Sequence, residues 1–347
     1  MSSTNDTATI RNSLLDRFPR VQLVQQPTPQ ERLDRLSEEL GVELWVKRDD
    51  LAGVSFGGNK SRQLEYYLGE AAAKQATVIL ITGAVQSNFV RTAAASAARL
   101  GMRTVVQLED RVQPPEPAYG QSGNLYLSKI LGAEIMRYPE GEDEAGADRA
   151  LRERAAELQQ QGERPFVIPL GLGNRPLGAL GYMRAAEEIL QSDISFDRIF
   201  VASGSGLTHG GLLSGMRQKG DLTRVTGSCV RRSATAQEQR MRTVLADIAV
   251  MLGCSTGAGH GDIDIWDGAL SPGYGRIGPP AAEAIRLAAR TEGMLLDPVY
   301  TAKAFAAIPG QIASGQLDRG AKVLFLHTGG LPALFAYEAT VLNALEA

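Results

Sequence analysis

Residues 57–66 read GGNKSRQLEY, a glycine turn that leads directly into a helical pattern. Glycine adopts backbone conformations that other residues avoid, so the pair at 57–58 permits a sharp turn. Residues 61–74, SRQLEYYLGEAAAK, are rich in good helix formers. The pattern places Lys60 at the start of a helix, where its side chain can face a cleft. A lone lysine is more often a solvated surface charge, so its role depends on the rest of the chain.

Outward from this segment, short apolar runs alternate with helical patterns. The runs lie at residues 76–84, 103–110, 164–171, 198–202, 224–230 and 322–326, and the helical patterns at 88–100, 124–133, 178–191, 209–218, 233–253 and 331–345. Repeated alternation of this kind predicts an α/β protein whose mostly parallel sheet is covered by helices.

The length of the chain bounds its organisation. A chain of 347 residues exceeds the size at which single cores stop growing, about 250 residues, so two lobes with a cleft are expected. Ligands of such sheets bind beyond the carboxyl ends of the strands. The glycine-rich loops at 57–59, 83–88, 204–208 and 329–330 are therefore predicted to line one cleft.

Composition argues against several classes of partner. The 36 basic and 39 acidic residues give a net charge of −3, and the basic residues are scattered, so no nucleic-acid partner is expected. Neither an apolar signal segment nor a run of about 18 apolar residues occurs, which favours a cytoplasmic protein without a membrane partner. Cys229 and Cys254 have no metal-ligand spacing, and the three histidines are far apart, so no metal site is expected.

The loop at residues 203–208, SGSGLT, follows one apolar run and precedes a helix. Backbone N–H groups at such a helix start can bind a phosphate. A dinucleotide fingerprint is the rival interpretation, but the spacing is GxGxxxG, and Arg231 and Arg232, not an acidic residue, follow the next strand. An NADPH-dependent reductase therefore stays a minor alternative.

Further polar segments stand where apolar runs or helices end. Asn88 in Gln86-Ser87-Asn88 is well placed as a helix N-cap, and Ser87 can point its hydroxyl into the cleft. No GxSxG elbow accompanies this serine, which argues against a hydrolase of the Ser-His-Asp type. Residues 271–275, 297–301 and 327–330 are polar and contain glycine or tyrosine, and they are predicted to converge on the same lip of the sheet.

These segments occur in a characteristic order: GGNKSRQLEY, GAVQSN, ASGSGLTHGGL, GYG, AARTEGMLLDPVYTAK and HTGGLPALFAY. From about Pro27 to Tyr337 the chain resembles the D-cysteine desulfhydrase and 1-aminocyclopropane-1-carboxylate (ACC) deaminase family. The resemblance implies fold type II, with two domains, each a mostly parallel twisted sheet flanked by helices, and pyridoxal phosphate (PLP) in the cleft between them. It predicts a large PLP-binding domain of residues 1–59 plus 172–347, a small domain of residues 60–171, and a homodimer.

The resemblance also implies roles for individual residues. Lys60 would form the Schiff base with PLP, and Asn88 would lie at the ring hydroxyl. The full set predicted to hold the cofactor is Asn59, Lys60, Asn88, Gly204, Ser205, Gly206, Leu207, Thr208, Thr301 and Thr328. The substrate would contact Gln86, Ser87, Asn88, Phe89 and Tyr274, and the catalytic groups would be Lys60, Ser87, Tyr274 and Tyr300.

Three positions depart from the pattern of the family. Gln63 stands where relatives usually have a lysine that helps to hold the phosphate, and Leu207 replaces a glycine of the phosphate loop. Phe89 follows QSN where histidine or glutamine is common. The fold and the cofactor tolerate these changes, whereas Phe89 alters the polarity beside the predicted substrate segment.

The residue after the tyrosine of DPVY separates two chemistries. ACC deaminases have a glutamate there that stabilises a protonated pyridine, whereas this chain has Thr301, as desulfhydrases do. A neutral hydroxyl favours loss of a β-substituent over ring opening. The predicted function is therefore α,β-elimination from a small amino acid of the D-cysteine or cysteate class, which releases pyruvate, ammonia and the sulfur leaving group. An ACC-deaminase-like activity and a non-catalytic ligand-binding module are the alternatives.

Overall fold

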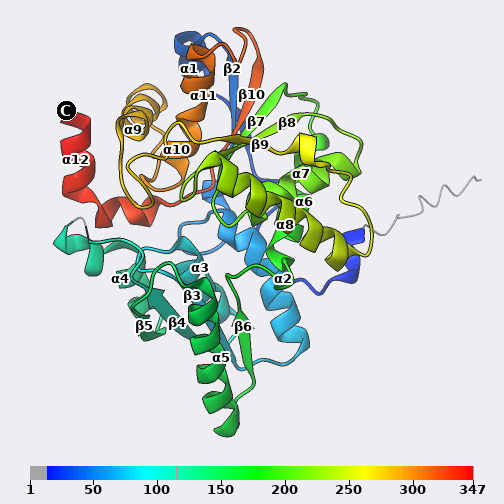
Figure 1. Ribbon diagram of the computed structural model, residues 1–347, viewed down its shortest axis with the longest axis vertical. Helices are drawn as coiled ribbons and strands as arrows, with labels where there is room; N and C mark the ends of the chain where they lie inside the picture. The colour runs from blue at the N-terminus through cyan, green and yellow to red at the C-terminus, as the bar shows by residue number, and fades with distance from the viewer. Residues whose placement is uncertain (1–13, 115, 347) are drawn as a thin grey trace, which may run out of the picture.

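Two sheets organise the chain in the computed structural model, which describes residues 14–114 and 116–346 (Figure 1). The larger sheet has the order β1 (Gln30–Arg32), β2 (Glu43–Lys47), β10 (Lys322–Leu326), β7 (Arg198–Ser203), β8 (Arg224–Cys229) and β9 (Asp264–Trp266). The smaller sheet has the order β5 (Glu134–Tyr138), β4 (Arg103–Glu109), β3 (Val78–Ala84) and β6 (Pro165–Ile168). Neighbouring strands pair in parallel except β1 and β2, which are antiparallel.

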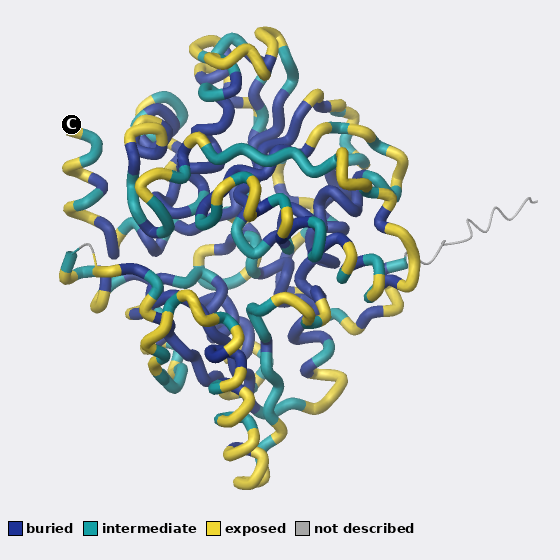
Figure 2. The backbone as a smooth tube through the Cα atoms, in the orientation of Figure 1, coloured by how far each residue is buried: buried dark blue, intermediate teal, exposed yellow. Residues whose placement is uncertain are grey.

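Helices cover both faces of the smaller sheet. Strand β3 is buried along its whole length (Figure 2), as expected for a parallel strand between two helical layers. On one face, Val78 and Leu80 pack with Leu151 of α5 (Glu144–Gln160). On the other face, Ile79 and Ile81 share a core with α2 (Asn59–Ala73) and α3 (Asn88–Arg99).

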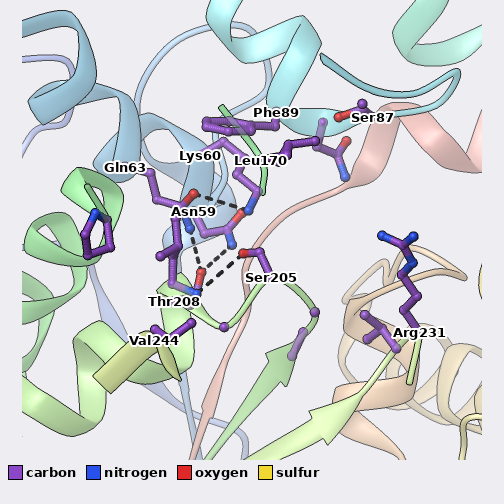
Figure 3. A pocket seen from close by; sticks show the side chains of 18 of the residues that line it. Asn59, Lys60, Gln63, Ser87, Phe89, Leu170, Ser205, Thr208, Arg231 and Val244 are labelled. Carbon is purple, nitrogen blue, oxygen red and sulfur yellow. Dashed lines mark hydrogen bonds between the residues drawn. The ribbon is translucent and has the colours of Figure 1, made fainter. Parts of the chain in front are cut away.

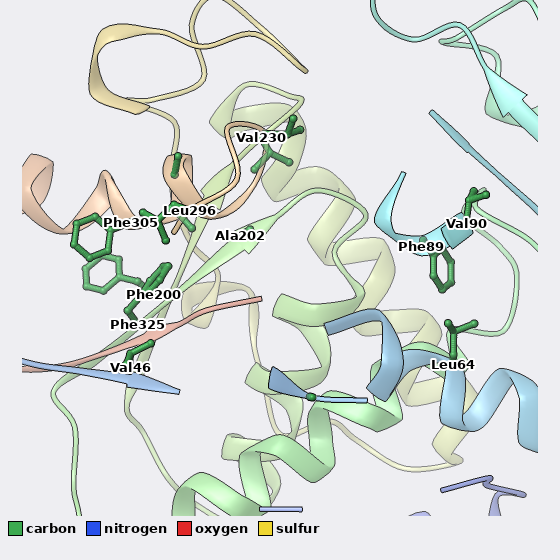
Figure 4. Packing of buried hydrophobic residues seen from close by; sticks show 14 of the residues in the cluster. Val46, Leu64, Phe89, Val90, Phe200, Ala202, Val230, Leu296, Phe305 and Phe325 are labelled. Atoms are coloured by element: carbon green, nitrogen blue, oxygen red, sulfur yellow. The ribbon is translucent and has the colours of Figure 1, made fainter. Parts of the chain in front are cut away.

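The larger sheet is covered in the same way. Helices α6 (Leu177–Leu190), α7 (Leu207–Gln218) and α8 (Ala234–Leu252) supply apolar side chains to a core with Ile199, Val201 and Leu324. Other residues of these strands join the core that contains α1 (Asp34–Leu40), α9 (Pro279–Glu292), α10 (Thr301–Phe305) and α11 (Ala307–Ala313). Figure 4 shows Phe305 beside Phe200 and Phe325. The Phe305 and Phe325 rings meet edge to face at 5.3 Å between centroids.

The remaining elements are short. They are helices α4 (Gly123–Ile130) and α12 (Glu338–Glu346) and the 3₁₀ turns η1 (Leu14–Arg17), η2 (Asp49–Leu51), η3 (Pro117–Gly120), η4 (His260–Asp262) and η5 (Leu331–Ala336). No helix among the described residues combines the length and the apolar character that crossing a bilayer requires. In the described part of the chain, no group of three His, Cys, Asp or Glu side chains is placed to hold a metal ion.

The predicted α/β fold with two mostly parallel sheets is confirmed, with local corrections. The helix predicted at 331–345 is interrupted at Tyr337, between η5 and α12. The predicted N-cap of α3, Asn88, is wrong by one residue: Ser87 caps the helix, because its Oγ accepts a hydrogen bond from Val90 N at 3.3 Å.

The strands divide between the sheets as the predicted domains do. All four strands of the smaller sheet fall within residues 60–171, and all six strands of the larger sheet fall outside that range. Helix α2 contacts both α3 and α6, so it lies between the two sheets (Figure 1). The division into these two domains stays a prediction, and residues 1–13 of the predicted large domain lie outside the described residues.

A buried ionic network fixes the first turn of α2. The Arg62 guanidinium donates to Asp49 Oδ2 at 2.9 Å and to Glu188 Oε1 at 2.6 Å, and Lys47 Nζ lies 2.9 Å from Glu188 Oε2. The side chains of Arg62, Asp49 and Lys47 are 0% exposed, and that of Glu188 is 8% exposed. Two cations thus face two carboxylates without competition from water.

Hydrogen bonds saturate the same network. Thr28 Oγ1 donates to Asp49 Oδ1 at 2.8 Å, and the hydroxyl of Tyr182 donates to Asp49 Oδ2 at 2.6 Å. Burial would raise the pKa of Asp49, but the Arg62 guanidinium, Lys47 and the Tyr182 hydroxyl together outweigh that effect and the pKa is lowered. The network therefore remains ionised, and it ties α2 to the end of β2 and to α6.

Loss of one charge from this network should be costly. We expect Glu188→Gln to reduce the free energy of unfolding by about 3 to 5 kcal/mol, because it leaves Arg62 and Lys47 buried with one carboxylate between them. Urea unfolding without added cofactor measures the change. Glu70→Gln is the control: Glu70 pairs with Lys74 and Arg175, which are both more than half exposed, so its loss should cost less than about 1 kcal/mol. Equal losses in the two variants would contradict this account.

Candidate active site

One cavity collects residues that follow six different strands. Beyond the ends of β3, β4, β6, β7, β8 and β10, its lining includes Ser87, Arg111, Leu170, Gly204 to Thr208, Arg231 and Thr328, and the start of α2 contributes Asn59, Lys60 and Gln63. Tyr274 and Tyr300 complete the same wall. Residues of both sheets therefore meet at the carboxyl ends of their strands, which is where parallel sheets bind ligands.

Two glycines bring the start of α2 into this cavity. Gly57 and Gly58 have φ values of +61° and +105°, which side-chain-bearing residues rarely adopt. A Cβ atom on Gly57 would lie 2.1 Å from Asp50 O, and one on Gly58 would lie 2.9 Å from Thr328 O. The close approach lets Asn59 N donate to Thr328 O at 3.1 Å, so the segments of Lys60 and Thr328 are joined.

Lys60 has the environment of a reactive amine. Its Nζ lies 3.4 Å from Gln63 Oε1 and 5.2 Å from the centroid of the Phe89 ring (Figure 3). Burial lowers the pKa of Lys60 to about 8. In about a tenth of the molecules the Lys60 amine is then neutral at pH 7, which is a far larger fraction than for a solvated lysine.

The glycine loop at the start of α7 is built to receive an anion. Gly206 has a φ of +95° and stands directly before Leu207, the first residue of α7, whose first N–H groups have no partner within the helix. Thr208 Oγ1 accepts from Asn59 Nδ2 at 2.9 Å and from Gln63 Nε2 at 2.8 Å (Figure 3). Since both bonds use the hydroxyl oxygen as acceptor, the hydroxyl proton is left to donate to a ligand.

An arginine cluster forms another part of the wall. Glu144, at the start of α5, accepts from Arg231 at 2.8 Å, from Arg232 at 2.8 Å and from Arg240 at 3.3 Å. Burial would raise the pKa of Glu144, but these arginines outweigh it and the pKa is lowered. Six cationic side chains and two carboxylates line the cavity: Lys60, Arg111, Arg175, Arg231, Arg232 and Arg240, with Glu144 and Asp247. This balance favours an anionic ligand.

The QSN segment divides between the cavity and the protein interior. Ser87 and Asn88 line the cavity, and Asn88 Oδ1 accepts from Asn124 Nδ2 at 2.9 Å, so the Asn88 amide nitrogen is the end left to donate. Gln86 does not line it. Its side chain donates to Tyr119 O at 2.6 Å and accepts from Asn124 N at 2.9 Å, which commits it to the loop before α4.

Two tyrosines predicted to act on substrate are brought together. The hydroxyls of Tyr274 and Tyr300 lie 2.7 Å apart, and both side chains line the cavity. Burial and the Tyr274 hydroxyl raise the pKa of Tyr300 well above its usual range. Tyr300 is thus protonated near neutral pH, and its hydroxyl forms one hydrogen-bonded pair with that of Tyr274 on the cavity wall.

Thr301 lies behind the cavity wall. Its hydroxyl donates to Asp297 Oδ1 at 2.8 Å, and its Oγ1 accepts from Asp297 N at 2.7 Å. Asp297 also accepts from the backbone N–H groups of Val299 and Tyr300, so its carboxylate organises the whole DPVYT turn. Of the two threonines predicted to hold the cofactor, Thr328 lines the cavity and Thr301 does not, so a cofactor contact of Thr301 stays a prediction.

Several residues of the cavity were not predicted from the sequence as parts of the site. Gln63 lies one helical turn beyond Lys60 and was noted only as a departure from the family, although that spacing puts both on one face of α2. Arg111 and Leu170 follow the ends of β4 and β6, so their strand-end positions were the available signal. Glu144 and its arginine partners come together only in the tertiary structure.

The site fits a phosphate-bearing aldehyde. A Cβ atom on Gly206 would lie 3.1 Å from both Met241 Sδ and Val244 Cγ2, so the loop is closely packed, and its residues Gly204 to Thr208 line the cavity. The free proton of Thr208 and the helix start suit a phosphate. An amine with a lowered pKa on the same wall suits an aldehyde.

Comparison with known proteins agrees with this chemistry. A family model described as "Pyridoxal-phosphate dependent enzyme" matches residues 21–329. The chain is 39% identical to a D-cysteine desulfhydrase of Yersinia enterocolitica and 40% identical to one of Salmonella choleraesuis, in each case over 94% of this chain and 98% of the relative.

A solved structure described as an ACC deaminase homologue superposes with a TM-score of 0.84 at 36% identity, covering 96% of this chain and 98% of the other. The resemblance inferred from the motifs and the expected cofactor, pyridoxal phosphate, are both confirmed. The chain belongs to the family of pyridoxal-phosphate dependent enzymes.

Proposed function

We propose that the protein is a PLP-dependent carbon–sulfur lyase that removes the β-substituent of a small amino acid of the D-cysteine or cysteate class. The products are pyruvate, ammonia and the sulfur leaving group. The relatives at 39 and 40% identity support this class. The observation that carries the proposal is structural: a lysine with a lowered pKa, an anion loop and a hydrogen-bonded tyrosine pair line one cavity.

The chain offers a set of groups that would hold the cofactor. Lys60 would carry it covalently, and the N–H groups of Gly204 to Thr208, with the Thr208 hydroxyl, would bind its phosphate. The amide of Asn88 would donate to the ring oxygen, and Thr328 would face the ring nitrogen. When bound, PLP withdraws electrons from the α-carbon of an attached amino acid, which acidifies the α-proton and permits a β-substituent to leave.

The other groups would bind the amino acid and move protons. The start of α3 at Ser87 would hold the α-carboxylate, since a helix N-terminus favours negative charge. Lys60, as a free amine, would be the base that removes the α-proton, and its lowered pKa suits it to that role. The Tyr274–Tyr300 pair would supply a proton on the leaving-group side.

ACC-deaminase-like ring opening is the second candidate, and the structural neighbour at 36% identity favours keeping it. A protonated pyridine requires a carboxylate beside the ring nitrogen. The residue that lines the cavity near that expected position is Thr328, which is neutral, and the nearby Asp297 is committed to the turn of Thr301. Elimination is therefore the better-supported reaction.

The proposal extends to a cytoplasmic homodimer. Cys229 and Cys254 are both free thiols, which suits a reducing compartment. Exposed apolar side chains occur on three neighbouring elements: Tyr126 and Ile130 of α4, Phe335 of η5 and Leu342 of α12. Such a surface suits burial against a second copy.

A product screen tests the reaction class. We expect pyruvate from at least one enantiomer of cysteine, cysteate or 3-chloroalanine, because each carries a good β-leaving group, and little from serine. ACC is scored for 2-oxobutyrate in the same screen. Release of 2-oxobutyrate alone would favour the deaminase, and turnover of no amino acid by the cofactor-loaded protein would favour a binding module.

The role of Lys60 is tested by trapping. Borohydride reduction followed by peptide mapping should label Lys60, and the rate of PLP capture by the cofactor-free protein should rise about tenfold from pH 7 to pH 9, as the fraction of neutral amine rises through a pKa of about 8. Lys303 is an internal control: burial lowers its pKa to about 8 as well, but its Nζ donates to Leu270 O and Gly273 O. Labelling of Lys303 in place of Lys60 would overturn the assignment.

The anion loop is tested by Gly206→Asp. The φ of +95° disfavours any side chain there, and the carboxylate would repel a phosphate, so PLP affinity should fall at least about tenfold. Equilibrium titration of cofactor absorbance measures it. Gly253→Asp is the matched control, because Gly253 also has a positive φ, of +68°, but lies at the exposed end of α8 with open space around its Cβ position. Equal PLP affinities in the two variants would refute the placement of the phosphate.

A further inference from the structure

Arg111 differs from the other buried arginines of the cavity because one of its outer nitrogens is buried without a hydrogen-bond partner. Its side chain is 8% exposed and lines the cavity. Nε donates to Glu109 Oε2 at 2.8 Å. Nη2 lies 2.6 Å from the same oxygen without hydrogen-bond geometry, and within residues 14–114 and 116–346 it is the one buried cationic nitrogen without a hydrogen-bond partner.

The Glu109 carboxylate is shared between Arg111 and another donor. Its Oε1 accepts from Thr82 Oγ1 at 2.7 Å, so the two oxygens serve two different donors. Arg231, Arg232 and Arg240 share Glu144. A guanidinium has five N–H donors, and a buried donor without an acceptor is costly. Arg111 is thus poised to bind an anion that enters the cavity.

The position of Arg111 indicates which anion. A Cβ atom on Gly275 would lie 2.5 Å from Val112 Cγ2, so Val112 packs against the GYG turn. Its neighbour Arg111 therefore stands beside Tyr274. Its charge acts on both Tyr274 and Tyr300. The phosphate loop lies at the start of α7 and the proposed α-carboxylate site at the start of α3, so Arg111 serves the tyrosine side of the cavity.

We propose that Arg111 binds a negatively charged β-substituent and makes a β-sulfonate, as in cysteate, the preferred substrate class over a β-thiol. This inference rests on the proposed lyase function and deepens it. A sulfonate offers three oxygen acceptors to the fork of an arginine, whereas a neutral thiol offers a weak acceptor. The thiol would leave the guanidinium unsatisfied.

The reaction balances without an oxidant. Cysteate and one water give pyruvate, ammonium and hydrogen sulfite. The Cα–H bond breaks to a base, and the C–S bond breaks with its electron pair on sulfur. Water then hydrolyses the remaining enamine in its imine form, after a proton has returned to the β-carbon. Arg111 would bind the sulfonate before cleavage and the sulfite charge after it.

The test compares two substrates that share the α-carboxylate and differ in the β-substituent, cysteate and the neutral 3-chloroalanine, each as both enantiomers. In Arg111→Gln the ratio of kcat/KM for cysteate to that for 3-chloroalanine should fall at least about tenfold relative to wild type, since charge-assisted hydrogen bonds are lost for one substrate alone. Arg111→Lys should keep part of the ratio. Arg175→Gln is the control, because it removes a cavity-lining charge that is paired with Glu70, and it should leave the ratio unchanged.

Glu109 would be left buried without its partner in Arg111→Gln, so the double variant Arg111→Gln/Glu109→Gln is measured as well and should show the same fall in the ratio. An equal loss for both substrates would assign Arg111 to the α-carboxylate or to folding and overturn the proposal. Three other results would also overturn the proposal: an unchanged ratio in Arg111→Gln, an equal fall of the ratio in Arg175→Gln, or a wild-type enzyme that turns over 3-chloroalanine and cysteine but not cysteate. Absence of pyruvate from every substrate would instead reject the lyase function itself.

Discussion

The buried network around Arg62 is the constraint on which the site depends. Lys60 and Arg62 share the first turn of α2, so whatever fixes Arg62 also fixes the amine. Asp49 attaches that turn to the end of β2, and Glu188 attaches it to α6. A buried pair of this kind adds little net stability compared with apolar packing, but an unpaired charge at this depth is costly. The arrangement therefore penalises any displacement of α2, and it holds Lys60 at the meeting point of the two sheets.

The sequence predicted what local chemistry determines. The strands were predicted from apolar runs bounded by glycine turns and helix formers. Ser87, Gly204 and Thr328 follow the ends of these strands and line the cavity as expected. The sequence did not indicate which side chains form hydrogen bonds with each other in the tertiary structure. Thr301 followed a motif that pointed to the cofactor, yet the carboxylate of Asp297, four residues earlier, captures its hydroxyl. Gln86 likewise accepts a hydrogen bond from Asn124 N at the start of α4.

The ion pairs between the two sheets were the main feature of the site that the sequence did not predict. Glu144 begins α5, which packs on the smaller sheet, whereas Arg231 and Arg240 belong to the part of the chain that forms the larger sheet. Their spacing in the sequence does not predict the contact. Each is an ordinary surface charge when considered alone. Together they form ion pairs that span the cavity wall, so the relative position of the sheets and the electrostatics of the cavity depend on the same residues. Opening of the cavity would have to break these pairs.

Gln63 shows how a departure from the family can be accommodated. An ammonium at this position would stand one helical turn from Lys60 and would add a like charge to the desolvation that already lowers the pKa of that lysine. The amide instead accepts from Lys60 and donates to Thr208, which orients the threonine hydroxyl toward the cavity without a charge. Positive charge is supplied from the other side of the loop, where Arg240 donates to Ser205 O at 2.9 Å and Arg232 to Gly204 O at 3.3 Å. The anion loop thus keeps an electropositive setting and the reactive amine has no cationic neighbour at this position, so Gln63 is compatible with both the cofactor and the chemistry.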